Sequence, residues 1–579
     1  MNYATPPGFR DVLVDEAAER ERLTRAVQDL FAGRGFQPIE TPTLEAMAVM
    51  RAGGRVTASP FKLFDAQGSL LAMRPDVTLQ VARMAATRLA GQPGPFRLRY
   101  TQRVFREAEV ELQARAREVT QMGVECIGET GPETDAEVVS LLIEALELVG
   151  VRNCTLAVAT VGVLRALLEA SGAPAWWKTR VLDAYHDSDF VALDELTNSA
   201  PASASVPPVF ASAIRALPRI RGGREAVDEV RALVAPLGCE DGLDDFERTL
   251  DLVQDAGLGA NILVDFSVMS SFDYYTGIVF EAYAPGGGAP LGSGGRYDNL
   301  LSAYGQARPA AGCAFYLEQA MTAASDVARG RGAGQPDRPL RIAVPKGSLN
   351  ADSIAALEGA GLDVTGLADP GRQLIIRNPG VEYVIVRPTD APAFVSLGAA
   401  DCGICGKDSL LEADTDVVEL VDLGFGGCRF VVAEPRGAGA AVAEHERQLG
   451  SIRVATKYPR ITQAHYAKTG TQVEIVKLHG NIELAPLTGM AERIVDITAT
   501  GTTLRENDLV IVEEVLASTA RFCANPCAYR TDERIVRLAD ALDANARAAA
   551  GVAAERAECA EAAADISENA ARATAEERK

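Results

Sequence analysis

At 579 residues the chain is too long for a single hydrophobic core, and it should fold as three or four domains. Its 47% hydrophobic and 23% charged residues are typical of globular proteins, and it contains no run of about 18 apolar residues that would predict a membrane-spanning helix. No charged-then-apolar leader is evident, which favours a cytoplasmic location. The net charge of −22 argues against a broad nucleic-acid surface, but small phosphorylated ligands need only a local cationic site.

The ten cysteines are scattered along the chain and do not form a zinc-binding pattern. Two close pairs occur, Cys402 with Cys405 and Cys523 with Cys527, and each lacks a second pair or nearby histidines. The first pair lies in an apolar run typical of a strand, which favours buried thiols over a redox or metal site. We therefore expect no metal held by protein side chains.

Residues 1–325 show a periodicity of apolar residues that predicts strands in runs, with helices between the runs. Helices are expected over 15–34 and 136–149, a small helical insertion over about 199–245, and strands over 96–107, 120–127, 264–283 and 310–317. Residues 70–78 predict a strand that leads into a helix beginning near Pro75, and a glycine-rich turn is expected over 286–295. This order favours an α+β domain with a mostly antiparallel sheet and helices on one side.

Five short motifs in this half are similar to those of a known family: Arg74-Pro-Asp-Val-Thr78, Phe105-Arg-Glu107, Gln121-Met-Gly-Val-Glu125, Asp273-Tyr-Tyr-Thr-Gly277 and Gly294-Gly-Arg-Tyr-Asp298. On these motifs residues 1–325 resemble the catalytic core of histidyl-tRNA synthetase, which has a class II aminoacyl-tRNA-synthetase fold. The resemblance implies a histidine site made by Asp76, Arg106, Gln121, Glu125, Tyr274 and Tyr275. There the acidic and amide groups would hold an ammonium and an imidazole, and Arg106 would pair with a carboxylate.

Departures from the synthetase pattern indicate that the amino-acid site is kept while the chemistry is lost. Ser270 stands where the family has an arginine that activates the adenylate, and Gln319 replaces an arginine that contacts ATP. Tyr316 replaces a glycine of the third motif, and Asp76 replaces a longer glutamate. The sequence is thus similar to the synthetase paralogue that regulates histidine biosynthesis. An inert dimerising scaffold is the alternative interpretation.

A glycine- and proline-rich stretch over 326–339 predicts a linker, after which short apolar strands alternate with helices. Strands are expected at 341–344, 383–386, 402–404, 417–420, 429–433, 452–455, 473–477 and 494–497, and helices at 350–361, 392–397, 461–469 and 482–491. The alternation favours parallel sheets with ligands at the carboxyl ends of the strands. A Gly/Ala/Glu-rich connection near 436–450 is expected to divide this α/β domain, residues 340–545, into two lobes, and an Ala-rich helical tail over 546–579 follows.

The stretch Asp496-Ile-Thr-Ala-Thr-Gly-Thr-Thr-Leu504 carries a specific chemical signal. It follows an apolar run typical of a buried strand and places four threonines around Gly501. Backbone N–H groups in such a turn form a concave anion site, and the hydroxyls add donors. Asp496 is an acceptor at the strand's end, where the hydroxyls of a sugar would lie beside that anion. We interpret the stretch as a ribose 5-phosphate site; an ordinary strand-to-helix turn with hydroxyl caps is the alternative.

Residues 340–545 resemble the short-form catalytic subunit of ATP phosphoribosyltransferase, a two-lobed fold like that of periplasmic binding proteins. The landmarks are Arg387-Pro-Thr-Asp390, Gly398-Ala-Ala-Asp-Cys-Gly403, Asp408, Arg453-Val-Ala-Thr-Lys457, Glu483-Leu-Ala-Pro486 and residues 496–504. The resemblance implies transfer of phosphoribosyl from phosphoribosyl pyrophosphate to N1 of ATP, the first step of histidine biosynthesis. Histidine bound in the first half of the chain would regulate that step.

The same resemblance implies roles for individual residues. Phosphoribosyl pyrophosphate would contact Glu483, Asp496, Thr498, Ala499, Thr500, Gly501, Thr502 and Thr503, ATP would contact Arg387, Asp390 and Lys457, and Arg372 and Lys346 would act in catalysis. Mg²⁺ would arrive on the substrates' phosphates. Ser348 stands where many members of the family have an arginine, so Arg372 is our main candidate for stabilising the leaving pyrophosphate. We expect a homo-oligomer; a histidine-activating enzyme and a solute-binding protein without turnover remain alternatives.

Overall fold

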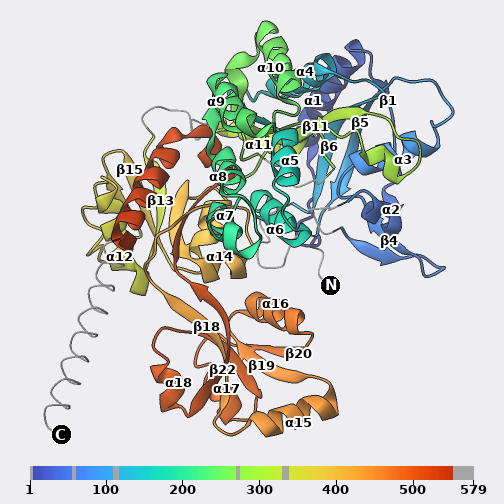
Figure 1. Cartoon of the computed structure of the whole chain (residues 1–579). Helices are drawn as coiled ribbons and strands as arrows, with labels where there is room; N and C mark the ends of the chain where they lie inside the picture. Colours follow the sequence, from blue (N-terminus) through green and yellow to red (C-terminus); the bar gives the residue numbers. More distant parts are fainter. Residues whose placement is uncertain (1–3, 55–59, 108–115, 269–273, 329–337, 552–579) are drawn as a thin grey trace, which may run out of the picture. The chain divides into compact units, whose positions relative to one another are not determined.

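The computed structural model describes residues 4–54, 60–107, 116–268, 274–328 and 338–551 (Figure 1). The chain divides into two compact units. Unit 1 comprises Met1–Arg338 together with Pro526–Asp532, and unit 2 comprises Pro339–Asn525 together with Glu533–Lys579. Among the described residues, no helix is both long enough and apolar enough to cross a membrane.

Unit 1 is built on a nine-stranded sheet that is mostly antiparallel, as predicted. In spatial order its strands are β1 (Gln37–Pro38), β5 (Phe96–Phe105), β6 (Glu118–Ile127), β12 (Ala310–Tyr316), β11 (Gly292–Arg296), β10 (Ile278–Tyr283), β7 (Thr155–Thr160), β9 (Ile262–Asp265) and β8 (Arg221–Gly222). Only the pairs β1–β5 and β7–β9 are parallel. The expected turn over 286–295 is wrong in part, because its last residues pair as strand β11 between β10 and β12.

Helices account for the rest of unit 1, beside a small sheet of β2 (Leu44–Ala46), β4 (Leu70–Met73) and β3 (Lys62–Phe64). The helices include α1 (Val14–Gly33), α3 (Thr78–Thr87), α4 (Pro132–Val149) and α11 (Leu317–Ala328). Helix α3 begins three residues after the predicted start, because an Asp76 Oδ1 accepts the Thr78 N–H at 2.8 Å and leaves Pro75–Val77 outside the helix.

The helical insertion of unit 1 is wider than the predicted 199–245. Six helices, with the short strand β8 between the fourth and the fifth, lie in the connection between β7 and β9: α5 (Val161–Ala170), α6 (Ala175–His186), α7 (Phe190–Ser203), α8 (Pro208–Ala216), α9 (Glu225–Val234) and α10 (Leu243–Asp255). Because β7 and β9 are parallel neighbours, the chain needs a long crossover at this point.

Unit 2 contains two mixed sheets, one in each lobe. The first has the order β14 (Ile375–Asn378), β15 (Val381–Val386), β13 (Leu340–Pro345), β16 (Cys402–Gly406), β23 (Ala520–Ala524) and β17 (Val418–Asp422). The second has the order β20 (Val473–Lys477), β19 (Ile452–Thr456), β21 (Arg493–Thr498), β18 (Cys428–Pro435) and β22 (Leu509–Ser518). The expected parallel sheets are confirmed only in part: β13 pairs in parallel with β15 and β16, and β19 with β20 and β21, but β14, β18, β22 and β23 run antiparallel to their neighbours.

The lobes of unit 2 divide at a different place from the expected 436–450. The chain passes from the first sheet to the second between β17 and β18, over 423–427, and returns at Thr519 between β22 and β23. The segment expected as the break instead forms α15 (Gly439–Leu449) inside the second lobe. Its alanines, which look like a loose connection beside glycine, are the strongest helix formers.

Two segments near the expected boundaries also differ from prediction. The first residues of the expected linker, 326–328, end helix α11, and 329–337 lie outside the described residues. Helix α19 (Pro526–Thr531) belongs to unit 1, where Arg221 Nη1 donates to the Tyr529 carbonyl at 2.9 Å. A helix covers 533–551, and the remainder of the predicted tail lies outside the described residues.

Candidate functional site

The threonine loop, residues 498–503, joins the end of β21 to the short helix α18 (Thr502–Glu506). Gly501 has φ +70°, a left-handed conformation that glycine adopts without strain. Its N–H donates to Thr498 Oγ1 at 2.8 Å, and Thr500 Oγ1 lies 2.9 Å from Thr502 Oγ1. Thr500 and Thr502 are both exposed. The loop thus presents hydroxyls gathered on a tight glycine turn, as a phosphate site requires.

Two carboxylates and a lysine lie together at the base of this loop. Burial and the nearby Glu483 carboxylate raise the pKa of Asp496 to about 6, while the Ile497 N–H and the Lys457 ammonium act in the opposite direction. Asp496 Oδ1 accepts that N–H at 2.8 Å. Lys457 directly follows β19, the parallel neighbour of β21, which explains its proximity. The structure therefore brings Lys457, which was expected to contact ATP, near Asp496 and Glu483, which were expected to contact phosphoribosyl pyrophosphate.

The predicted cations of the first lobe share one sheet edge. Pro345 and Val386 are paired at the carboxyl ends of parallel strands β13 and β15, so the residues after them, Lys346 and Arg387, are neighbours. The Lys346 N–H donates to the Val386 carbonyl at 2.8 Å. Arg372 lies before β14 rather than after a strand, but β14 runs antiparallel to β15 and so begins at the same edge.

The two lobes meet near Tyr458, the residue after Lys457. Burial raises the pKa of the Tyr458 phenol, and the Asp408 carboxylate of the first lobe and the Asp496 carboxylate of the second raise it further. Glu412 of the first lobe accepts the backbone N–H groups of Arg460 at 3.1 Å and Ile461 at 3.2 Å, at the start of α16 (Pro459–Thr469). These contacts hold Asp496 and the threonine loop of the second lobe toward the first lobe.

In unit 1, Asp76 and Gln121 form a buried hydrogen-bonded pair. Gln121 Nε2 donates to Asp76 Oδ2 at 2.8 Å, and the Val77 N–H donates to Gln121 Oε1 at 3.0 Å. The two side chains are 4% and 2% exposed. Among the residues that the structure describes, Asp76 has hydrogen-bond donors but no ion-pair partner, so its carboxylate can accept a cationic group of a ligand.

Glu125 lies at the centre of a second polar group beside this pair. Thr78 Oγ1 donates to its Oε1 at 2.8 Å, Tyr100 donates to the same oxygen at 3.3 Å, and the Tyr297 hydroxyl donates to Oε2. Burial nevertheless raises the pKa of Glu125 to about 8. Gly312 lies opposite Glu125 on the neighbouring strand β12, where an added Cβ would lie 1.8 Å from Oε2, so only glycine leaves room for this carboxyl.

Aromatic rings close the same region. Tyr274 and Tyr275 have ring centroids 4.8 Å apart, and Tyr297 makes an edge contact with each of them, at 5.6 and 6.4 Å. The carboxylates of Asp76 and Glu125 are near enough to raise the pKa of the Tyr275 phenol, which burial already raises. The structure thus brings together the predicted acidic, amide and tyrosine residues.

Arg106 lies at the edge of this cluster and contacts Tyr316, the residue that replaces a glycine of the third synthetase motif. Its Nη2 donates to the Tyr316 hydroxyl, and its guanidinium carbon lies 4.6 Å from the Tyr316 ring centroid. Its Nε donates to the Pro75 carbonyl at 3.4 Å, next to Asp76. Because Tyr316 pairs across the sheet with Gln121, this contact places Arg106 beside the polar group.

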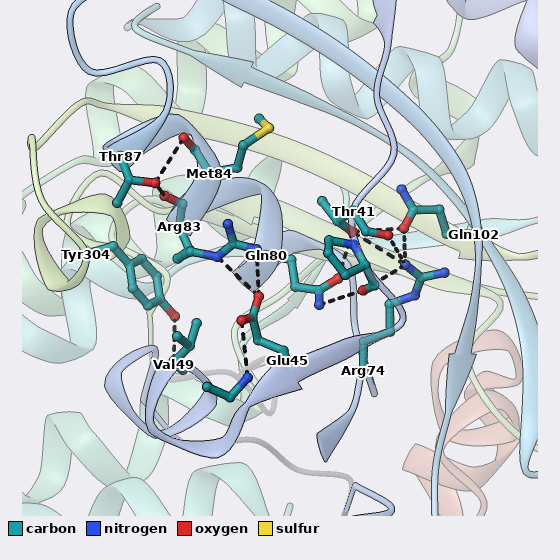
Figure 2. A network of polar contacts seen from close by, with 12 residues as sticks. Thr41, Glu45, Val49, Arg74, Gln80, Arg83, Met84, Thr87, Gln102 and Tyr304 are labelled. Carbon is teal, nitrogen blue, oxygen red and sulfur yellow. Dashed lines mark hydrogen bonds and ion pairs between the residues drawn. The ribbon is translucent and has the colours of Figure 1, made fainter. Parts of the chain in front are cut away.

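Arg74, the first residue of the motif that contains Asp76, has a structural role. Figure 2 shows its guanidinium among Thr41 and Gln102, and it also donates to the Thr41 and Arg103 carbonyls, each at 2.7 Å. Burial lowers its pKa. These contacts fix the chain just before Asp76.

Sequence reasoning missed several members of the unit 1 site. Tyr100, Thr78 and Tyr297 surround Glu125, although only the last two fall in the quoted motifs. The inward alternation of β5 could have identified Tyr100. Ser270, a predicted departure from the synthetase pattern, lies outside the described residues.

The folds and the grouped residues fit one class of protein: a two-lobed α/β transferase joined to a synthetase-like antiparallel sheet. Comparisons with known proteins identify both parts. A family model described as histidyl-tRNA synthetase matches residues 8–320, and one described as ATP phosphoribosyltransferase matches residues 387–544.

Relatives of both kinds occur in one organism, Moorella thermoacetica. Its ATP phosphoribosyltransferase is 52% identical over 214 residues, which cover 36% of this chain and 93% of that protein. Its ATP phosphoribosyltransferase regulatory subunit is 35% identical over 325 residues, which cover 56% of this chain and 82% of that protein. A solved ATP phosphoribosyltransferase regulatory subunit/histidyl-tRNA synthetase from Bacillus halodurans C matches with a TM-score of 0.51 and 26% identity, covering 66% of this chain and 93% of that one.

The chain belongs to the ATP phosphoribosyltransferase family, and it carries a regulatory part like histidyl-tRNA synthetase in the same polypeptide. It is an enzyme of the first step of histidine biosynthesis, in which phosphoribosyl is transferred from phosphoribosyl pyrophosphate to ATP.

Proposed function

We propose that the transfer takes place in the second lobe, at the threonine loop and the carboxylates of Asp496 and Glu483 beside it. Histidine bound in unit 1 would control the rate. The grouping of Asp496, Glu483 and Lys457 beside the threonine loop supports this proposal most directly. Thr498–Thr503 would hold the 5-phosphate through hydroxyls and backbone N–H groups, and the two carboxylates would accept the ribose hydroxyls.

The reaction needs positioning more than acid–base chemistry. N1 of ATP attacks C1 of the ribose, the C1–O bond breaks, and pyrophosphate leaves with inversion at C1. Because N1 is already a nucleophile, no side chain has to remove a proton from it, and the enzyme acts by aligning the substrates and stabilising charge. Arg372 and Lys346 would stabilise the leaving pyrophosphate, which carries Mg²⁺ as part of the substrate.

The remaining cations would serve ATP. Arg387 follows β15 next to Lys346, and Asp390 lies three residues further along the same loop. Lys457 extends from the second lobe, where its ammonium lies 5.7 Å from the Tyr458 ring centroid. We propose that Arg387 and Lys457 neutralise the ATP phosphates and that Asp390 accepts a hydroxyl or amino group of the nucleotide.

Histidine is our proposed ligand for the polar cluster of unit 1. Asp76 and Glu125 supply acidic acceptors, Gln121 an amide, Tyr275 an aromatic wall and Arg106 a partner for a carboxylate. A free amino acid with a second basic group satisfies all of these at once. Binding there would lower the transfer rate, which gives feedback control; homo-oligomerisation and a cytoplasmic location complete the proposal.

The test is the initial rate of adduct formation from ATP and phosphoribosyl pyrophosphate by the full chain, with and without histidine. We expect turnover with Mg²⁺ and inhibition by histidine. Histidine-dependent exchange of pyrophosphate into ATP would instead show a synthetase activity. Tight binding of the substrates without any product would contradict the assigned catalytic site and favour a solute-binding protein.

A further inference from the structure

We propose that Arg505 is a further substrate-binding residue of the transferase, which contacts the 5-phosphate of phosphoribosyl pyrophosphate beside the threonine loop. The inference rests on the proposal that this loop, residues 498–503, holds that phosphate. Arg505 is exposed at the end of α18. Its neighbour Leu504 is 4% exposed and anchors the helix to the lobe, so the position of Arg505 relative to the loop is fixed.

The guanidinium of Arg505 lies against the loop. Its Nη1 donates to the Thr500 carbonyl at 2.9 Å, and its Nη2 donates to Thr502 Oγ1 at 3.0 Å. A Cβ added to Gly501 would come within 3.2 Å of Nη1, so the cation lies over the glycine at the centre of the turn. The residues that surround the proposed phosphate therefore also surround this cation.

No acidic side chain neutralises Arg505 within the described ranges of the chain. Two other arginines of the same lobe are paired, Arg429 with Glu514 at 3.3 Å and Arg436 with Asp508 at 2.8 Å. The chain has 79 acidic and 57 basic residues, so carboxylates are abundant as partners. An arginine that instead contacts one hydroxyl and one carbonyl is available to an anion that binds at that hydroxyl.

A phosphate matches this arrangement chemically. A guanidinium offers paired N–H donors whose geometry fits two phosphate oxygens, and such charge-assisted bonds are stronger than those between neutral groups. Thr502 Oγ1 accepts from Arg505 and retains its own hydrogen, and Thr500 Oγ1 lies 2.9 Å away. One of these hydroxyls donates to the other, and the remaining hydroxyl and the guanidinium can donate to one phosphate group.

The test compares Arg505→Gln and Arg505→Lys with Arg436→Gln, a control that removes a paired arginine from the same lobe. KM for phosphoribosyl pyrophosphate and KM for ATP are measured separately on the full chain. We expect Arg505→Gln to raise the first about 10- to 100-fold with a much smaller change in kcat and in the second. Lysine should restore part of the loss, and the control should match the unaltered chain.

Two inhibitors locate the contact on the substrate. Competitive inhibition by ribose 5-phosphate should weaken in Arg505→Gln by the same factor as KM, while inhibition by inorganic pyrophosphate should not change. If both inhibitors weaken equally, or if both KM values rise together with a loss of thermal stability, Arg505 only braces the turn and the inference is overturned.

Thr502→Val separates failure of the inference from failure of the site. If Thr502→Val raises KM for phosphoribosyl pyrophosphate and Arg505→Gln does not, the loop holds the phosphate without Arg505. If neither variant changes that KM, the loop is not the phosphate site, and the proposed function of the second lobe fails with it.

Discussion

Replacing Glu125 by glutamine should weaken inhibition by histidine and remove its dependence on pH. The Glu125 side chain is 1% exposed and accepts hydrogen bonds from Thr78, Tyr100 and Tyr297. Burial raises the pKa of its carboxyl to about 8, so the empty site holds mostly a neutral acid at pH 7. A cationic group of histidine prefers the ionised carboxylate, and binding is therefore coupled to loss of a proton.

The size of the effect follows from that pKa. The ionised fraction of Glu125 rises from about one tenth at pH 7 to about one half at pH 8, so the half-inhibitory concentration of histidine should fall about fivefold. The imidazole of free histidine, with an ordinary pKa of about 6.5, is mostly neutral in this range. Glutamine cannot ionise, and the loss of a charged partner, about 1.5–3 kcal/mol, should weaken inhibition roughly 10- to 100-fold.

The assay is the rate of adduct formation by the full chain at several histidine concentrations, at pH 7, 7.5 and 8. Glu129→Gln is a matched control, because Glu129 follows the same strand and its carboxylate lies 3.4 Å from Arg97 Nη1, outside the cluster. Turnover without histidine should be similar in Glu125→Gln, Glu129→Gln and the unaltered chain. Equal inhibition of Glu125→Gln and the unaltered chain, or no change between pH 7 and 8, would refute the reasoning.

Three further predictions address other residues of the two sites. Asp496→Asn should raise KM for phosphoribosyl pyrophosphate about 10- to 100-fold in steady-state kinetics. In the unaltered chain that KM should also rise about tenfold from pH 7 to 5, because a carboxyl of pKa about 6 becomes protonated. In the variant, KM should change with pH only as far as the substrate itself titrates. Tyr316→Phe removes the hydroxyl that holds Arg106, so calorimetry should show weaker binding of histidine and unchanged binding of histidinol, which lacks the carboxylate; an unchanged ratio of affinities would contradict this role. Gly312→Ala would place a Cβ 1.8 Å from Glu125 Oε2, and it should abolish inhibition by histidine while turnover persists; normal inhibition would mean that the ligand binds elsewhere.

Local patterns in the sequence predicted those parts of the fold that depend on neighbouring residues. The alternation of 96–107 and 120–127 led directly to β5 and β6, and the apolar periodicity of 136–149 to α4. The antiparallel strands β22 and β23 were missed because their pairing partners are distant in the chain, β18 for the first and β16 and β17 for the second. Such pairing is decided by tertiary packing, which no local window contains.

For the candidate sites, as for the fold, the sequence predicted the residues that belong to recognisable motifs and missed others. Asp496 and Glu483 are 13 residues apart, and the resemblance to ATP phosphoribosyltransferase implied that they act together; the structure brings the two carboxylates near each other. Tyr100 and Arg505 were not predicted because sequence alone does not show which way their side chains point. The first reaches Glu125 only through the register of β5 on β6, and the second reaches the threonine loop only through the turn of α18.

Binding of phosphoribosyl pyrophosphate to a variant that carries both Thr500→Glu and Thr502→Glu tests the central claim most directly. Two carboxylates on the loop would repel a phosphate and remove two hydroxyl donors. Calorimetry on the full chain should then show no binding of phosphoribosyl pyrophosphate, with histidine bound as in the unaltered chain. Equal binding of phosphoribosyl pyrophosphate by the variant and the unaltered chain would contradict the account.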